Sequence, residues 1–172
     1  MYLNVYSPEQ GVQTYTRDFR CAGTVTAIIS VHNQLFLGTV RVGKSTVVKI
    51  LAGKYNFTTK DYEMTQGIEL HDKTFVIDGH TVDTVLVDTA GHELYYWLVR
   101  PICDPSAFFV LCFDLTNKDS FHAVEALTKE LDIRKGALVG CKSDLVSRHV
   151  VSLAAAEELA AKNNLKLLLT ST

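Results

Sequence analysis

An eight-residue stretch has the residue types and spacing of a phosphate-binding loop. Residues 38–45 read Gly-Thr-Val-Arg-Val-Gly-Lys-Ser, the pattern G-x-x-x-x-G-K-[ST]. The glycines let the backbone curl so that its N–H groups point inward, and the following helix directs its positive dipole end at the same spot. We expect Lys44 to reach the β- and γ-phosphates of a nucleotide and the Ser45 hydroxyl to bind Mg²⁺. The residues predicted to bind the phosphates are Gly38, Val40, Arg41, Val42, Gly43, Lys44, Ser45 and Thr46.

The residues on either side of the loop distinguish this prediction from its alternative, a glycine turn that merely joins a strand to a helix. Residues 35–37 are apolar and suit the end of a buried strand. Residues 45–52 suit a helix that Gly53 ends. A strand, a glycine loop and a helix in this order favour the phosphate site.

The composition indicates one globular domain, because 47% of the 172 residues are hydrophobic. A net charge of −2 gives no electrostatic reason to expect nucleic acid or an anionic membrane as a partner. The four cysteines lack metal-ligand spacing, which favours free thiols in a reducing compartment. The sequence shows no apolar run of membrane-spanning length, no signal peptide and no C-terminal prenylation box. We expect a cytoplasmic protein without a direct membrane anchor.

Strand-like and helix-like segments alternate along most of the chain. Asp78-Gly79 between two of the strands is a strong hairpin signal. We therefore predict an α/β fold with a mostly parallel six-stranded sheet, to which the hairpin adds one antiparallel strand. A helix is expected to end near Pro101. The predicted strands cover 35–37, 67–77, 81–87, 107–115, 137–141 and 165–170, and the helices 45–52, 93–99, 120–131 and 152–163.

The N-terminal part of the chain has no clear periodicity. Residues 1–31 are predicted to be an extension of uncertain order, and residues 32–172 to form the globular domain. Within the extension, residues 24–31 suit a strand, but His32-Asn33-Gln34 separates them from the strand that enters the phosphate loop. Residues 54–66 form a long polar loop, which in a compact domain is usually functional or disordered.

Polar side chains follow the predicted strands at their carboxyl ends, where open parallel sheets bind ligands. Asp88 suits Mg²⁺ coordination opposite Ser45, although alone such an aspartate is more often a turn former. Gly91 can bring its N–H close to a γ-phosphate, and the Thr65 hydroxyl can complete the metal shell. Considered singly, Gly91 is also explained as a turn glycine, and Thr65 as an ordinary loop residue. The predicted metal ligands are Ser45, Thr65 and Asp88.

The run Cys141-Lys142-Ser143-Asp144-Leu145 suits recognition of guanine. The Asp144 carboxylate can accept hydrogen bonds from N1–H and from the exocyclic N2 amine of guanine, and adenine presents neither donor on that edge. Lys142 can lay its aliphatic stem along the base plane. Ser171 and Thr172 follow the last strand and are expected to close over the base, with the Thr172 N–H toward guanine O6.

Taken in order from Gly38 to Thr172, these segments resemble the five sequence motifs of Ras-superfamily small GTPases. The resemblance implies the small-GTPase form of the P-loop NTPase fold, GTP or GDP with Mg²⁺ as ligands, and catalytic roles for His92, Gly91 and Thr65. Residues 114–121 read Asp-Leu-Thr-Asn-Lys-Asp-Ser-Phe and resemble the Rab branch. Residues 60–69, with Thr-x-Gly after Tyr-x-Met, are similar to the Rab-like GTPase subunit of intraflagellar transport complex B.

Three positions depart from the family pattern. Val40 stands where Ras itself has glycine and would crowd the γ-phosphate. His92 replaces the glutamine that orients the attacking water, and a neutral imidazole lacks the paired donor and acceptor of an amide. Cys141 replaces the asparagine whose amide bonds guanine N7 and ties the base loop to the phosphate loop. We predict very slow GTP hydrolysis and weakened nucleotide binding.

The resemblance also implies protein partners. The sequence stops where the family begins its final helix, which normally helps to cover strands containing Leu138, Leu167 and Leu169. Either the sequence is a fragment or a partner covers this surface. The resembling subunit pairs with a small β-sandwich subunit and docks on coiled-coil subunits of the transport complex, so we expect those partners and a location in the cilium or flagellum.

Three other functions stay open. A structural subunit whose nucleotide is permanent or absent is favoured by the three departures and opposed by the intact metal- and base-binding residues. A generic Rab GTPase of vesicle traffic fits the Rab-like motifs. An ATP-using phosphoryl transferase is opposed by Asp144, which favours guanine.

Overall fold

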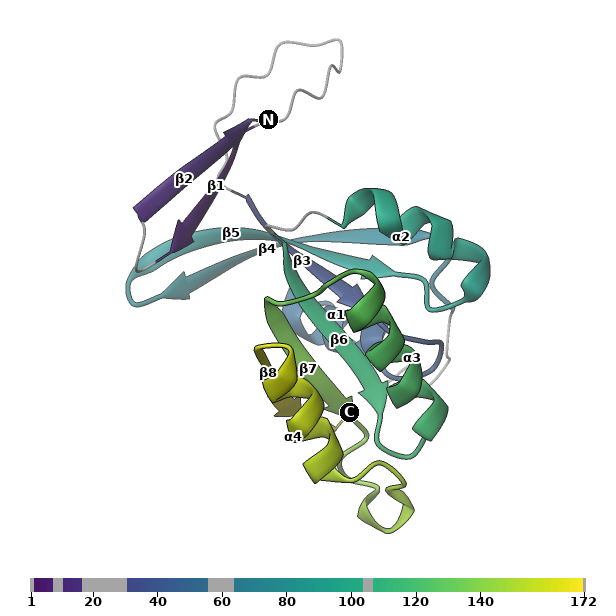
Figure 1. Cartoon of the computed structure of the whole chain (residues 1–172). Coiled ribbons are helices and arrows are strands. Elements are labelled where there is room, and N and C mark those ends of the chain that lie inside the picture. Colours follow the sequence, from purple (N-terminus) through teal and green to yellow (C-terminus); the bar gives the residue numbers. More distant parts are fainter. Residues whose placement is uncertain (1, 8–10, 17–30, 56–63, 104–106, 172) are drawn as a thin grey trace.

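A six-stranded sheet with helices on both faces organises the structure (Figure 1). The computed structural model describes residues 2–7, 11–16, 31–55, 64–103 and 107–171. Within these residues, the six strands of this sheet lie in the order β4-β5-β3-β6-β7-β8. In this sheet only β4 and β5 pair antiparallel, so the predicted α/β fold is confirmed. The strands are β3 (Val31–Leu37), β4 (Ile68–Ile77), β5 (His80–Thr89), β6 (Phe108–Asp114), β7 (Gly136–Cys141) and β8 (Leu165–Leu169).

The helices lie close to the segments predicted for them. The first helix ends at Gly53, whose φ of 73° is favourable for glycine and whose N–H bonds the last carbonyls. The third begins at Asn117, whose side chain accepts from the N–H groups of Asp119 and Ser120. The helices are α1 (Lys44–Ala52), α2 (Tyr96–Ile102), α3 (Lys118–Glu130) and α4 (Leu153–Lys162), with 3₁₀ turns η1 (Glu93–Tyr95) and η2 (Val146–Arg148).

The sheet divides the hydrophobic core into two layers. On one face, Val48 of α1 belongs to a cluster with Phe36 of β3 and Leu86 of β5. On the other face, residues of α2, α3 and α4 pack on Leu35 and Leu111, among others. Because side chains alternate between the faces of a strand, β3 and β6 contribute to both layers. Residues 35–37 of β3 and 109–113 of β6 are therefore all apolar. This burial fixes the strand ends from which the candidate site residues project.

The hairpin between β4 and β5 has the turn that Asp78-Gly79 predicts. Asp78 and Gly79 have φ values of 50° and 78°, and Ile77 pairs with His80 across the turn. Two positive φ values match the twist of a two-residue hairpin loop. β4 pairs only with β5 in this sheet and therefore lies at one of its edges.

The strand that enters the phosphate loop is longer than predicted. It begins at Val31 and includes residues 32–34, where the sequence predicts a break. These polar residues are accommodated because Val31 to Asn33 pair only with β5, whereas pairing with β6 begins at Gln34. Backbone pairing therefore extends the strand beyond its apolar part. The rest of the strand predicted at 24–31 lies outside the described residues.

The helical stretch predicted at 93–99 begins at Glu93 as expected but differs in type and length. Its first turn is the 3₁₀ turn η1, and α2 then continues through Pro101 to Ile102. Pro101 is the penultimate residue of α2, so its missing N–H removes one backbone donor only from the last turn. Cys103 closes that turn by donating to the carbonyls of Val99 and Arg100.

Part of the N-terminal segment forms a hairpin that the sequence did not predict. Strands β1 (Tyr2–Ser7) and β2 (Gly11–Thr16) pair antiparallel, with Tyr2 opposite Thr16. Every helix in the described part of the chain is too short or too polar to cross a membrane.

Candidate functional site

The phosphate loop has a curled backbone held against β6. Gly38 has a φ of 149°, and a Cβ there would lie 2.2 Å from the carbonyl oxygen of Cys112, so only glycine fits. Arg41 and Gly43 also have positive φ values, 61° and 103°. Gly43 is the N-cap of α1 and supplies no capping side chain to the first-turn N–H groups. These N–H groups are therefore available to bind an anion, as the sequence predicts.

Lys44 is buried and paired with the end of β5. Its ammonium lies 3.2 Å from Asp88 Oδ1 and also donates to the carbonyl oxygen of Thr89. The two side chains are 5% and 1% exposed, respectively, so the pair is shielded from solvent. Thr89 is itself held by a bond of 2.7 Å from its hydroxyl to the carbonyl oxygen of Phe36. A phosphate bound in the loop would meet an ammonium already fixed in place.

Three oxygen-bearing side chains from separate segments meet beside Lys44. Ser45 Oγ lies 2.8 Å from Thr65 Oγ1, which lies 3.2 Å from Asp88 Oδ2. The structure thus brings together all three residues predicted to bind Mg²⁺, although 20 positions separate Ser45 from Thr65 and 23 separate Thr65 from Asp88. Two residues after Thr65, the carbonyl of Gly67 accepts from the N–H of Ala90, which fixes this segment beside the end of β5.

The chemistry of this oxygen set fits Mg²⁺ bound together with phosphate. Hydroxyl and carboxylate oxygens are hard ligands, and Mg²⁺ in such sites usually takes few protein ligands and completes its shell with phosphate and water. Among the described residues, no group of three or more His, Cys, Asp or Glu side chains forms an alternative metal site.

Gly91 lies directly against the phosphate loop. A Cβ at Gly91 would stand 2.4 Å from the carbonyl carbon of Thr39 and 2.6 Å from the backbone nitrogen of Val40. The segment after β5 therefore approaches the loop as closely as backbones allow. Val40, at the tip of the loop, is 39% exposed.

His92 is exposed and serves as the N-cap of η1. Its Nδ1 accepts from the N–H of Leu94 at 3.2 Å, which requires the tautomer with its proton on Nε2. In this arrangement the neutral ring offers a donor to its surroundings and has no acceptor left for a water proton.

The predicted base loop joins the ends of β7 and β8. The Ser143 N–H donates to the carbonyl of Thr170, and the Thr170 N–H donates to the carbonyl of Gly140. Asp144 and Ser171 are exposed at this junction, as a side chain that binds a base edge must be. Thr172 lies outside the described residues.

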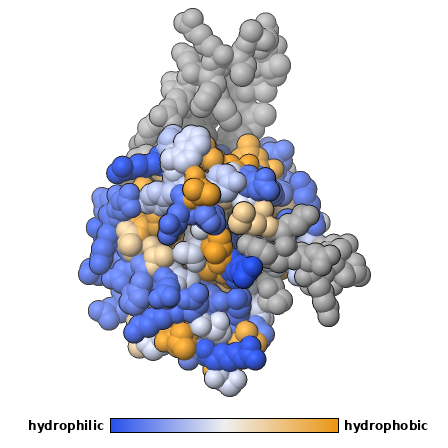
Figure 2. Space-filling view, turned by 90° about the vertical axis from the view of Figure 1, so that its right-hand side faces the viewer, coloured by the Kyte–Doolittle hydropathy of each residue, from blue (hydrophilic) through white to orange (hydrophobic). Residues whose placement is uncertain are grey.

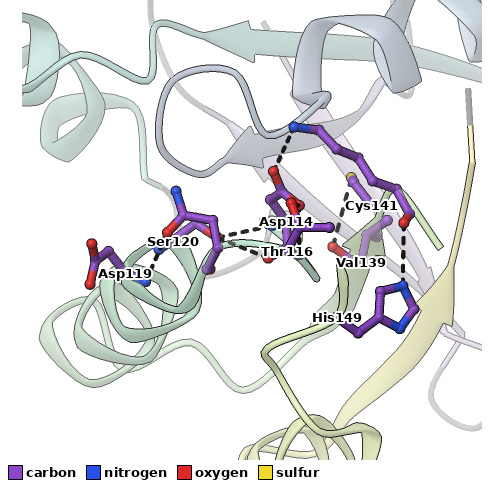
Figure 3. A network of polar contacts seen from close by, with 9 residues as sticks. Asp114, Thr116, Asp119, Ser120, Val139, Cys141 and His149 are labelled. Carbon is purple, nitrogen blue, oxygen red and sulfur yellow. Dashed lines mark hydrogen bonds and ion pairs between the residues drawn. The ribbon is translucent and has the colours of Figure 1, made fainter. Parts of the chain in front are cut away.

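Cys141 is buried beneath the phosphate loop. Its Sγ lies 3.6 Å from the position that a Cβ on Gly43 would take. The thiol has a long contact of 4.0 Å with the carbonyl oxygen of Val139 (Figure 3). A hydrogen bond with Cys141, together with burial, raises the pKa of Cys112 well above its ordinary value. Both thiols therefore pack as small apolar groups, and Cys141 lacks the amide that would tie the loops together.

Asp114 also lies at this edge of the sheet, although the predicted site residues do not include it. This residue ends β6 and lies opposite Cys141 in the ladder with β7. Its carboxylate binds the ammonium of Lys142 at 2.5 Å. Its position at the end of a buried strand, the same signal that identified Asp88, was sufficient to find it.

Comparisons with known proteins agree with this arrangement. The family model described as the Ras family matches residues 33–172. The GTP-binding protein ypt1 of Schizosaccharomyces pombe is 32% identical over 142 residues, which cover 80% of this chain and 69% of that protein. The GTP-binding protein YPT1 of Saccharomyces cerevisiae is also 32% identical over 142 residues, covering 80% and 68%.

The buried pair of Lys44 and Asp88 predicts a specific stability effect. Asp88→Asn leaves the ammonium without its counter-charge and is expected to lower the free energy of unfolding by about 3 kcal/mol. Combining it with Lys44→Met removes both charges, so the double variant should be more stable than the sum of the two single effects. Urea unfolding of the ligand-free protein measures the free energies of unfolding of the single and double variants. Strictly additive losses would contradict the predicted coupling.

Proposed function

The chain belongs to the Ras family of small GTPases, and we propose that it is a Rab-like guanine-nucleotide switch that binds GTP or GDP with Mg²⁺ and hydrolyses GTP very slowly. The observation that carries the proposal is the meeting of Ser45, Thr65 and Asp88 beside the buried Lys44. Thr65 comes from a separate loop, so binding a metal here would join that loop to the phosphate loop.

Each group of the phosphate site has a separate task in this proposal. The backbone N–H groups of the loop and the Lys44 ammonium bind the phosphate oxygens. The hydroxyls of Ser45 and Thr65 and the carboxylate of Asp88 hold Mg²⁺, which when bound neutralises charge on the phosphates. Gly91, whose Cα packs on the loop, offers its N–H on the side of the terminal phosphate. Release of that phosphate would remove one of the partners that order Thr65.

Slow hydrolysis follows from His92 and Val40. Because Nδ1 of His92 is occupied by Leu94, Nε2–H can donate one hydrogen bond to a water but cannot accept its proton. Val40 adds a branched side chain at the exposed tip of the loop, where it hinders approach of a partner's arginine. The intrinsic rate of Ras itself is only about 10⁻⁴ s⁻¹, and an activating arginine adds ~10³–10⁵-fold. Without a glutamine to orient the water and with the approach of an activating arginine hindered, very little GTP turnover is left.

Guanine selection rests on Asp144, and affinity is reduced by Cys141. The exposed Asp144 is available to accept from both N1–H and the N2 amine of guanine. The buried Cys141 thiol supplies no amide to guanine N7. Losing such hydrogen bonds costs about 1–3 kcal/mol, roughly ten- to a hundredfold in affinity.

For partners, we propose the small β-sandwich subunit and the coiled-coil subunits of intraflagellar transport complex B, in the cilium or flagellum. The sequence support is the likeness of residues 60–69 to the Rab-like subunit of that complex. The structural support is exposed apolar surface on η1, α2 and β4: Leu94, Trp97 and Leu70 are 73%, 70% and 66% exposed. On the face that Figure 2 shows, apolar areas are separated by polar ones, an arrangement suited to several small anchors. A generic Rab role in vesicle traffic is the alternative.

The nucleotide that the protein carries tests its function. Denaturing the purified protein and chromatographing the supernatant should release a near-stoichiometric amount of guanine nucleotide, with GTP retained because turnover is slow. GDP alone would contradict slow hydrolysis, and adenine nucleotide would support a phosphoryl transferase. No nucleotide would support a structural subunit that lacks it.

His92→Gln should raise the single-turnover rate of GTP hydrolysis roughly tenfold, because an amide can donate to and accept from the attacking water. The measurement is phosphate release from preloaded GTP. Glu93→Gln, an exposed neighbour, is the matched control and should leave the rate unchanged. An unchanged rate in His92→Gln would show that water orientation is not what limits turnover.

Mixing the purified chain with the β-sandwich subunit should give a complex stable to gel filtration. Trp97→Ala should weaken it about tenfold or more, as truncation of a buried aromatic anchor does. Val146→Ala, which alters an equally exposed apolar residue on η2, should not. Absence of any complex would argue for the generic Rab role.

A further inference from the structure

A second ion pair lies at the end of the sheet next to the base loop. Asp114 Oδ2 and Lys142 Nζ are 2.5 Å apart, and the two side chains are 7% and 36% exposed. Asp114 ends β6, whereas Lys142 directly follows β7. The pair therefore links the last residue of a central strand to the loop predicted to hold guanine.

The carboxylate of Asp114 is held on its other side. Its Oδ1 accepts from the Thr116 N–H at 2.8 Å and from the Thr116 hydroxyl at 2.7 Å. One oxygen is thus occupied by Thr116 and the other by Lys142. Burial raises the pKa of Asp114, but the hydrogen bonds from Lys142 and Thr116 outweigh burial, so that the pKa lies below its ordinary value. The carboxylate is ionised throughout the neutral range.

The backbone around Asp114 is fixed as well. Its N–H donates to Ser120 Oγ at 2.9 Å, and the Leu115 N–H donates to the Cys141 carbonyl at 3.2 Å. Figure 3 shows Asp114, Thr116 and Ser120 gathered at the end of β6, beside Cys141. An acceptor fixed in side chain and backbone can determine where a flexible partner lies.

Lys142 is the flexible partner. It has a positive φ of 60°, and its carbonyl lies 3.4 Å from His149 Nε2. A lysine has four rotatable side-chain bonds, so without a partner for its ammonium the stem would sample many rotamers. With the ammonium bound to Asp114, the stem has both ends fixed.

We propose that Asp114 is a positioning residue for guanine binding: by holding the Lys142 ammonium, it keeps the aliphatic stem of Lys142 in place as one wall of the base site. The inference rests on the proposed binding of guanine nucleotide. It adds Asp114, which is not among the residues that the five small-GTPase motifs assign to that binding. Asp114 need not touch the nucleotide, because it acts through Lys142.

The test is the dissociation rate of a fluorescent GDP analogue from the full chain with excess Mg²⁺. Asp114→Asn keeps the size of the side chain and an oxygen for Thr116, but removes the charge that holds Lys142. We expect dissociation about tenfold faster. Asp119→Asn is the control. It removes the same charge from an exposed residue, which Figure 3 shows separated from Asp114 by Ser120, and should change the dissociation rate less than twofold.

A double-variant cycle separates positioning from a purely structural role. Lys142→Met should also accelerate dissociation, and adding Asp114→Asn to Lys142→Met should give no further acceleration. Thr116→Val, which removes one of the bonds that fix Asp114, should accelerate dissociation two- to threefold, again only when Lys142 is present. This milder variant carries the same test if Asp114→Asn does not fold.

The outcomes distinguish this inference from the proposed function. If the unaltered chain binds no guanine nucleotide, both are wrong. If it binds and neither Asp114→Asn nor Thr116→Val changes dissociation more than Asp119→Asn does, only the positioning role is wrong. Acceleration that persists in full in the Lys142→Met background would also overturn it, because Asp114 would then act independently of Lys142.

Discussion

The buried ion pair between Lys44 and Asp88 is the contact on which the candidate site depends. It joins the first residue of α1 to the end of β5, two elements that meet because β3 and β5 are neighbours in the sheet. Desolvating two charges is costly, so the pair needs its further bonds: the Thr89 carbonyl accepts from Lys44, and the Thr65 hydroxyl donates to Asp88. Through Thr65, the same contact reaches the separate loop that precedes β4.

A second lysine–aspartate pair lies at the ends of β6 and β7 and is more exposed to solvent. Asp114, like Asp88, is a carboxylate at the end of a strand, but its partner Lys142 is partly exposed and belongs to a loop. The predicted phosphate-binding half of the site is thus anchored in a buried interior, and the predicted base-binding half at the margin of solvent. Electrostatic interactions are weaker where water is near, so a substitution that breaks the Asp114–Lys142 pair should cost less free energy than one that breaks the buried Lys44–Asp88 pair.

Much of the fold was predictable because local signals and the global fold agree. The loop at 38–45, the turn at Asp78-Gly79 and the buried run before Asp114 each indicated the correct element. The start of β3 was missed because pairing with β5, a long-range contact, holds polar residues in a strand. The end of α2 was predicted slightly too early, because the effect of Pro101 depends on how near it lies to the helix end. The three oxygen-bearing residues that meet beside Lys44 were indicated by their types. The Asp114–Lys142 pair depends instead on the ladder between β6 and β7, which periodicity does not reveal.

The two thiols beneath the phosphate loop provide an internal reporter of how often that loop opens. Cys112 and Cys141 are almost fully buried, whereas Cys103 is partly exposed. Alkylation requires an accessible thiolate, and the raised pKa of Cys112 makes it slower still. Its modification therefore proceeds only through fluctuations that lift the loop or separate the strands, at a rate set by the free energy of that local opening. Any ligand that closes the loop becomes visible as protection of a cysteine that it never touches.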